Sequence, residues 1–465
     1  MTIEVLPDDV ILAIFTFFVD TICIESWYTL VQVCRRWRHV VFAYPRHLNL
    51  RVLCTDRTAA RSIQDVWPVL PIVVRGTGDP RFLKKGADNI IAALELRDRV
   101  CAIDLPCIPD GLLEGFVAAT QVQFPALTSL SLGVGCTAHS GTILPDSFLG
   151  GSAPRLRTLL MDAFALPTLP QLLLSATDLV QLFLWDTVFP NYCGYIAPET
   201  MTICLSAMTK LDVLDLRFRS RRFRRSDQGS SDPPPLTFVV LPTLVSFNFR
   251  GSDEYLDELV ARNNAPPLDD VNLTLFGELR LSSAQFLRFV NQAQRIHALS
   301  QANVAFCGHR IEVTFLTQAR TAVHTNVSLE FPCGESDQLR YLARVCSSPL
   351  CLLFTLERLN IFEYAHSPRE WEEDDMEWTH WLNILRRFIT VKDMYLSEQV
   401  VPRVSFALRE LTEHQVTEVL PMLQHLFLEG LESSEAVQNT FGEFISTRRL
   451  SGHPLVIHSW QREHM

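Results

Sequence analysis

The sequence predicts an α/β protein with a small helical domain at its N-terminus. Two patterns predict this fold: an apolar, helix-like segment within the first fifty residues, and a short strand-like motif that recurs along the rest of the chain. The length of 465 residues exceeds most single compact cores, which favours several domains or a repeat architecture. Because 48% of the residues are apolar and 20% charged, a folded chain is expected.

The stretch LPDDVILAIFTFFV, residues 6–19, predicts a helix that begins at Pro7. A proline in the first turn loses no hydrogen bond, and Asp8 and Asp9 lie where the positive end of the helix favours carboxylates. A helix that is apolar on all faces must be covered on nearly all sides. Spacing places Ile11, Ile14, Phe15 and Phe18 on one face, and Leu12, Phe17 and Val19 on the others.

This apolar segment lacks the features of a targeting signal. No Lys or Arg precedes it, and Asp20 and Glu25 end it before the roughly 20 apolar residues of a spanning helix. We therefore expect neither a signal peptide nor a membrane anchor. The net charge of −11 argues against general binding to nucleic acid or to anionic membranes, which depends on clustered Lys and Arg.

The twelve cysteines are scattered and form no dense framework. Several lie in apolar surroundings, which is typical of reduced, buried thiols in the cytosol or nucleus. No cysteine or histidine spacing predicts a zinc site, and we expect no cofactor. The apolar cysteines are Cys23, Cys34, Cys204 and Cys351.

A second helical block, LVQVCRRWRHV at residues 30–40, follows the first after a gap. Together the two blocks resemble an F-box, whose usual pattern is Leu-Pro-x-Glu/Asp-hydrophobic-hydrophobic-x-x-Ile-Phe, then a leucine and Val-Cys-x-x-Trp. The resemblance covers residues 4–43, with Asp9 where glutamate is commoner. It implies three helices that bind the Skp-type adaptor of an SCF ubiquitin ligase.

Carried over by residue, the resemblance implies an adaptor-binding surface, or its immediate support, of nine residues. Such an interface buries about 800 Å² per partner around a few large apolar anchors. Among the nine we expect Cys34 and Trp37 to fill the F-box core. The nine residues are Leu6, Pro7, Ile11, Ile14, Phe15, Leu30, Val33, Cys34 and Trp37.

Beyond residue 99 the pattern apolar-x-x-apolar-x-apolar recurs with helix-compatible stretches between its copies. Each copy predicts a short strand, and the first seven starts (100, 127, 156, 179, 211, 244, 268) are 27, 29, 23, 32, 33 and 24 residues apart. Three further copies start at Leu356, Val391 and Leu423. This outline is similar to leucine-rich repeats, whose usual period is 20 to 29, so an irregular α/β solenoid is predicted. An ordinary α/β domain with parallel strands is the alternative.

Two segments interrupt the repeats and one ends them. RIEVTFLT (310–317) and NVSLEFPC (326–333) alternate at period two and predict strands of a hairpin. After Ser433 or Ser434, a helix through Phe441 and Phe444 and a strand in PLVIHSW predict a capping element. The predicted domains are 1–48 (F-box), 49–98 (connecting segment), 99–432 (repeats) and 433–465 (cap).

The whole chain also resembles a large group of F-box proteins of mushroom-type fungi. The similar segments are WPVLPIVV (67–74), FLGGSAPRLRTL (148–159), LPTLPQLLLSATDLVQL (166–182), SDEYLDELVAR (252–262) and RRLSGHPL (448–455). The likeness implies a substrate receptor that binds a ligase adaptor through its F-box and an unidentified target protein through its repeats. An interaction scaffold outside any ligase, with the F-box helices packed on the chain's own repeats, is the alternative.

Two charged runs are candidates for target binding. RFRSRRFRRS (217–226) carries six arginines that could pair with carboxylates or phosphates, serve in nuclear import, or form a solvated loop. The run REWEEDDMEW (369–378) is either an acidic docking surface or a polar loop leading into a helix. The six arginines are Arg217, Arg219, Arg221, Arg222, Arg224 and Arg225.

One short motif would fit an enzyme. GVGCTA (133–138) matches the dinucleotide fingerprint G-x-G-x-x-A, which binds phosphate at a helix N-terminus. However, the following residues lack an apolar helical period, and we find no P-loop, G-x-S-x-G or H-E-x-x-H motif. We therefore expect a protein without catalytic residues of its own.

Overall fold

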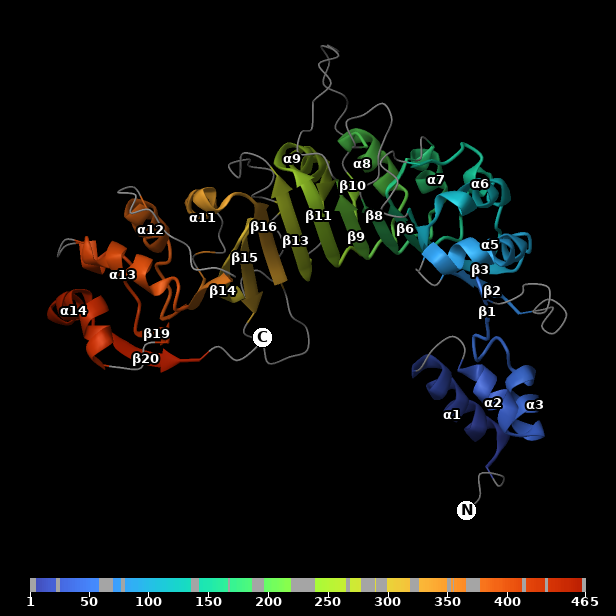
Figure 1. Ribbon diagram of the computed structural model, residues 1–465, viewed down its shortest axis with the longest axis horizontal. Coiled ribbons are helices and arrows are strands. Elements are labelled where there is room, and N and C mark those ends of the chain that lie inside the picture. The colour runs from blue at the N-terminus through green and yellow to red at the C-terminus, as the bar shows by residue number, and fades with distance from the viewer. Residues whose placement is uncertain are drawn as a thin grey trace, which may run out of the picture. The chain divides into compact units, whose positions relative to one another are not determined.

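A computed structural model describes most of the chain and divides it into two compact units, Met1–Leu211 and Asp212–Met465 (Figure 1). The division falls inside the predicted repeat region. The residues that the structure describes are 6–21, 26–57, 70–76, 80–134, 142–165, 168–185, 196–218, 239–264, 268–276, 289, 299–317, 326–348, 353, 355–364, 377–411, 415–430 and 434–461.

The first unit contains three N-terminal helices and a parallel sheet with the strand order β1-β2-β3-β4-β6-β8. In Figure 1 helices α5 to α8 lie along one side of these strands. The helices are α1 (Asp8–Thr21), α2 (Trp27–Val33), α3 (Arg35–Ala43), α5 (Pro80–Leu94), α6 (Asp110–Ala119), α7 (Leu169–Ser175) and α8 (Pro198–Ser206). The strands are β1 (Val52–Thr55), β2 (Ile72–Arg75), β3 (Val100–Ile108), β4 (Ser129–Val134), β6 (Thr158–Asp162) and β8 (Gln181–Trp185), with a small parallel pair β5 (Thr142–Ile143) and β7 (Phe164–Ala165).

The second unit contains a mostly parallel sheet with the order β9-β11-β13-β16-β15-β14-β17-β18-β19-β20. Its strands are β9 (Val213–Arg217), β11 (Ser246–Ser252), β13 (Asp270–Phe276), β14 (Leu299–Cys307), β15 (Arg310–Thr317), β16 (Asn326–Pro332), β17 (Arg358–Tyr364), β18 (Asp393–Leu396), β19 (His425–Glu429) and β20 (Val456–Trp460). Its helices are α9 (Asp253–Arg262), α11 (Gln338–Ser347), α12 (Glu377–Leu385), α13 (Val401–Arg409) and α14 (Ser434–Leu450), and β10 (Val239–Val240) pairs with β12 (Asn263–Asn264).

All ten copies of the recurring motif form strands. The apolar residue that opens each copy is buried, with Leu156 and Leu356 fully so. In nine copies it lies two residues before the strand, whereas Val100 is the first residue of β3. Within β6, β8 and β13 buried residues alternate with half-buried ones, since one face of the sheet is covered and the other is open. Helix α9 begins with a side-chain cap, because Ser252 accepts a hydrogen bond from Tyr255 N at 3.3 Å.

The predicted hairpin at 310–317 and 326–333 is confirmed, since β15 and β16 pair antiparallel. A strand that was not predicted, β14, pairs antiparallel with β15 and parallel with β17, so the parallel order resumes after it. The region 49–98, predicted as a connecting segment, is corrected: it supplies β1, β2 and α5 to the sheet of the first unit. Its strands lack the spacing of the recurring motif, which is why they were missed.

Two further expectations concern the C-terminal capping element and a membrane-spanning helix. The C-terminal segment forms the predicted helix, α14, and the predicted strand, β20, which adds to the sheet beside β19. Within the described residues no helix is long and apolar enough to cross a bilayer.

Candidate functional site

The three N-terminal helices pack into a small domain held at its ends by polar contacts. Helix α1 starts after Pro7 with Asp8 and Asp9 in its first turn, as predicted. The Arg36 guanidinium of α3 binds Asp8, with 3.1 Å from Nε and 2.7 Å from Nη2 to Oδ1. Both side chains are well exposed, so this ion pair contributes little to the stability of the domain. It connects the first turn of α1 to α3.

A compact apolar core joins the three helices. The ring of Phe15 is buried and meets the Trp37 ring edge-on, with 4.8 Å between centroids. Trp27 is fully buried, and its Nε1 donates to the carbonyl of Arg51 at 2.9 Å, which attaches the domain to the residue before β1. The other buried core residues are Ile11, Leu30, Val31, Val40 and Val41.

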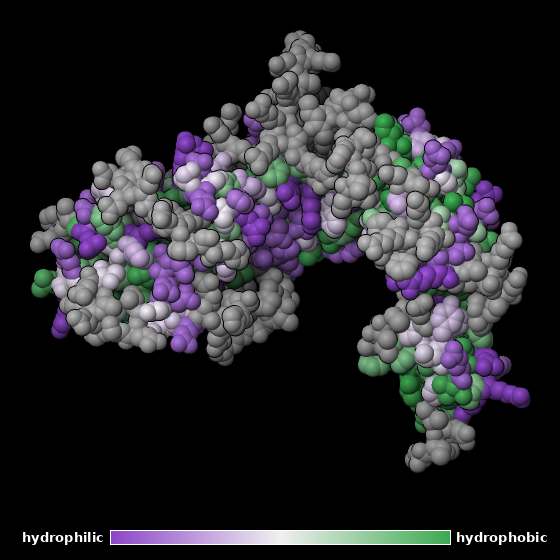
Figure 2. All heavy atoms as spheres, viewed as in Figure 1, coloured by the Kyte–Doolittle hydropathy of each residue, from purple (hydrophilic) through white to green (hydrophobic). Residues whose placement is uncertain are grey.

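The opposite side of α1 carries apolar side chains that the chain leaves exposed. Pro7, Val10, Ile14 and Phe17 follow one another at helical spacing and form what we call the α1 face. Val10 is 40% exposed, Ile14 44% and Phe17 75%. At the end of α2, Val33 is 59% exposed. Figure 2 shows hydrophobic surface gathered over these N-terminal helices. Clustered exposed apolar residues indicate an interaction surface.

The nine residues predicted for adaptor binding therefore divide into two groups. Those on the surface are available to a partner, and those inside hold the helices in place. Exposed are Pro7, Ile14, Val33 and Cys34; half-buried are Leu6 and Trp37; buried are Ile11, Phe15 and Leu30.

Cys34 corrects the expectation that it fills the core. It is exposed and extended between α2 and α3, with φ −156° and ψ 171°, so its side chain does not face the helix-packing core. Its Sγ instead accepts a hydrogen bond from Trp37 N at 3.4 Å and caps α3. Trp37 is half-buried against Phe15.

Two exposed residues of the α1 face, Val10 and Phe17, were not among the predicted nine. The sequence contains the signal that finds them, because 7, 10, 14 and 17 follow the helical period. Whether Val10 and Phe17 point outward depends on which side of α1 packs against α2 and α3. Only the structure shows which side that is.

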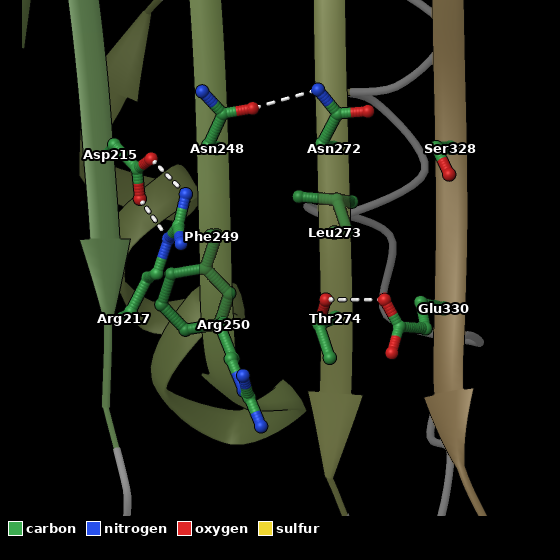
Figure 3. A pocket seen from close by; sticks show the side chains of 10 residues that line it. All are labelled: Asp215, Arg217, Asn248, Phe249, Arg250, Asn272, Leu273, Thr274, Ser328 and Glu330. Carbon is green, nitrogen blue, oxygen red and sulfur yellow. Dashed lines mark hydrogen bonds and ion pairs between the residues drawn. The ribbon is translucent and has the colours of Figure 1, made fainter. Parts of the chain in front are cut away.

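A second candidate surface is a hollow of about 360 Å³ on the open face of the second unit's sheet, lined from β9, β11, β13 and β16 (Figure 3). Asn272 donates to the side-chain oxygen of Asn248 at 2.8 Å, and Thr274 donates to Glu330 at 3.4 Å. Figure 2 shows this part of the sheet as hydrophilic. Neighbouring strands thus satisfy one another's polar groups.

Arg217, the first of the six predicted arginines, lies on β9 at the edge of this hollow. Its Nε and Nη2 donate to the two oxygens of Asp215 at 2.9 and 2.8 Å (Figure 3). Asp215 is only 3% exposed, so the guanidinium serves a buried carboxylate on its own strand. Arg219, Arg221, Arg222, Arg224 and Arg225 lie outside the described residues, as does the acidic run up to residue 376.

The glycine-rich motif does not open a helix at its first glycine. Gly133 lies within β4, where a Cβ would come within 2.3 Å of the Pro106 carbonyl oxygen of the neighbouring strand. Close strand approach therefore explains this glycine, whereas a dinucleotide phosphate needs a helix N-terminus. Residues 135–138 lie outside the described chain. Among the described residues no group of three His, Cys, Asp or Glu side chains is placed to hold a metal ion.

Comparison with known proteins agrees with the helical geometry at the N-terminus. A search of curated protein sequences finds no match to this chain. Residues 3–44 match the family profile described as F-box-like, a span that ends one residue past α3. The chain therefore carries an F-box-like domain at its N-terminus, followed by an α/β region with a large, mostly parallel sheet, and this domain suggests a role in binding a Skp-type adaptor.

Proposed function

We propose that the protein is a non-catalytic substrate receptor of an SCF-type ubiquitin ligase. The F-box helices bind the Skp-type adaptor, and the α/β region, a leucine-rich-repeat-like solenoid, binds a target protein. By holding both, the receptor raises the effective concentration of target lysines near the ubiquitin-charged enzyme of the complex. No residue of this chain takes part in bond chemistry.

The observation that carries the proposal is the exposed α1 face within a domain that matches the F-box-like family. Phe17 at 75% exposure is unfavourable in water unless a partner covers it. The repeat character of the α/β region is inferred from ten strands that share one sequence motif, each copy of which opens with a buried apolar residue. The alternative, a scaffold whose F-box helices pack on its own repeats, would have to bury Ile14, which is 44% exposed.

Co-purification with a Skp-type adaptor tests the proposal. The variant Ile14→Asp, Phe17→Asp places two charges on the α1 face without entering the core. If both residues are interface anchors, each loses about 2 kcal/mol, so binding weakens by about a thousandfold. Phe15→Asp is unsuitable, because it would bury a charge in the helical core.

The matched control changes two apolar residues of similar exposure outside the F-box. Leu174 on α7 is 42% exposed and Ile203 on α8 is 48% exposed, so Leu174→Asp, Ile203→Asp should bind the adaptor like the wild type. Adaptor binding that is absent in the wild type, or equal in all three proteins, would refute the proposal and favour the scaffold.

A further inference from the structure

The sheet of the second unit ends at β20 with an unprotected edge. Among the described strands β20 pairs with β19 alone, in parallel register, and it is the last strand of the order (Figure 1). Its sequence, VIHSW, contains no lysine, arginine, carboxylate or proline, the residues that usually keep a sheet edge from pairing. Val456 is 49% exposed, and Ser459 is exposed as well. The edge is therefore open to another strand.

The main chain of β20 directs half of its hydrogen-bonding groups toward β19 and half outward. Val456 N donates to the carbonyl oxygen of Gln424 at 2.9 Å, so the main-chain groups of Val456 point toward β19. Successive residues of a strand turn their N–H and C=O groups to opposite sides. Those of His458 therefore also point toward β19, whereas those of Ile457 and Ser459 point outward. Among the described strands none pairs with these outward groups.

The open face of the sheet carries a row of rings that ends at this edge. Tyr395, Phe427 and His458 are neighbours in the register of β18, β19 and β20. The rings of Tyr395 and Phe427 are stacked with 4.1 Å between centroids, and those of Phe427 and His458 with 4.6 Å. The described ring contacts of His458 all come from β19, since its other neighbour is His425. The row is therefore open on the outer side of His458.

A second copy of β20, running antiparallel about a two-fold axis at His458, fits all of these features. His458 is the middle residue of the strand, so the two copies overlap over their full length. Ile457 of each copy then lies opposite Ser459 of the other, and the two residues exchange both of their outward main-chain hydrogen bonds. The His458 rings meet across the axis and continue the row into the second copy. Val456 lies opposite Trp460, and pairs of a β-branched and an aromatic residue stabilise sheets.

We propose that the protein forms a symmetric dimer through antiparallel pairing of β20, which joins the sheets of two copies. A two-fold axis closes the assembly at two copies, because each edge is used once. Leu450, which ends α14 shortly before β20, is 89% exposed and adds uncovered apolar surface to the same C-terminal element. A short edge belongs to the low end of interface sizes, so we expect a dissociation constant in the micromolar range. This dimer does not depend on the ligase assignment.

An extended segment of another protein is the weaker candidate for this edge. Such a segment would have to present a ring opposite His458 and an apolar residue opposite Trp460. A second copy supplies both by symmetry, because His458 meets itself and Val456 meets Trp460.

Sedimentation equilibrium of the full-length protein tests the proposal, from about 1 to about 300 µM, a range that brackets micromolar affinity. The matched variants are Ser459→Pro and Ser459→Ala. Proline removes the outward N–H at an exposed edge position, where strands tolerate it, and leaves the hydrogen bonds to β19 in place. Ser459→Pro should weaken dimerisation about 30-fold or more, because two hydrogen bonds are lost per dimer and each contributes about a factor of five. Ser459→Ala keeps the N–H and should dimerise like the wild type.

A second pair of variants tests the position of the axis and leaves the main chain unchanged. His458→Lys places two like charges directly opposite each other across the axis and should give monomers. His458→Phe continues the row of rings and should dimerise. Thermal unfolding shows which variants are folded, and the His458 pair decides the matter if Ser459→Pro is not.

Three results would overturn the proposal. One is a wild type that stays monomeric at every concentration, which would leave the edge to a strand of another protein. The second is equal association within either pair of variants. The third is loss of the dimer in Ile14→Asp, Phe17→Asp, which would assign self-association to the α1 face. Ser459→Pro should still bind the adaptor, so failure of the dimer and failure of the proposed function are distinguishable.

Discussion

Replacing Arg448 tests how the C-terminal helix is attached to the second unit. Arg448 of α14 is 1% exposed, and its guanidinium reaches five main-chain carbonyls in the segment before β19 rather than a carboxylate. Burial lowers the pKa of Arg448, so its charge is itself unfavourable and is offset by these hydrogen bonds. The five acceptors are the carbonyl oxygens of Val416, Val419, Leu420, Pro421 and Leu423, at 3.2 to 3.4 Å.

The expected loss of unfolding free energy follows from those hydrogen bonds. Arg448→Met removes every donor, and a buried acceptor left unsatisfied costs about 1–3 kcal/mol. The bonds are long, and the Leu420 carbonyl also accepts from Leu423 N at 3.0 Å, so fewer than five acceptors are stranded. Removing the buried charge recovers part of the cost. We therefore expect a net destabilisation of about 3 kcal/mol, which for a unit of this size lowers the unfolding midpoint by about 6–12 °C.

Thermal unfolding followed by circular dichroism measures this shift, and hydrogen exchange in peptides covering 415–423 localises it. The neighbour Arg449 is exposed, so Arg449→Gln should change stability by less than about 0.5 kcal/mol. Arg448→Lys should fall between, because one ammonium group cannot reach carbonyls on both sides as the guanidinium does. An Arg448→Met protein that melts within about 2 °C of the wild type would show that the carbonyls need no donor.

Three further outcomes are expected. Phe15→Ala should lose about 3–5 kcal/mol of helical-domain stability and speed hydrogen exchange in α1 to α3, since it empties the buried core position. Glu363→Gln should cost about 3 kcal/mol by leaving Arg403 without its buried carboxylate at 3.0 Å, read as a lower melting midpoint. Burial raises the pKa of Cys346 to about 12, so at pH 8 iodoacetamide should alkylate exposed Cys34 before Cys346, as mass spectrometry will show. The stability due to neutral Cys346 is complete below pH 9 and is lost as pH rises toward 12.

The recurring leucine motif predicted ten strands because it reports burial directly. A residue that must lie under the covering helices is apolar in each copy, so the motif can be found even though the distance between copies varies. Strand β14 was missed because its sequence, LSQANVAFC, lacks leucines at the motif's spacing, and after its first residue the buried positions are Ala302, Val304 and Phe306. It becomes a strand through pairing with β15 and β17 on both sides, which is tertiary context that a local pattern does not contain.

The candidate adaptor surface was predicted less completely, for a related reason. An all-apolar helix shows that every side is covered by something, but its period cannot tell intramolecular cover from a partner. The division between Phe15 inside and Phe17 outside depends on where α2 and α3 pack. Cys34 was predicted in the core because its neighbours in sequence are apolar. The sequence does not reveal that its backbone is extended or that its thiol caps α3.

Charge behaves differently from hydrophobicity in this chain. Charge runs such as RFRSRRFRRS are conspicuous in the sequence, yet Arg217, the described arginine of that run, already has a carboxylate partner. The four arginines that line the groove between α11 and α12 are inconspicuous in the sequence, since they come from α11 and from the turn after α12, which are separated in the chain by the whole of β17. They are Arg340, Arg344, Arg386 and Arg387. A run of like charges can spread into solvent at little cost, whereas cations brought together by packing cannot separate without disturbing the helices. A local cation cluster in the fold is therefore set by helix packing, which a count of arginines along the sequence does not report.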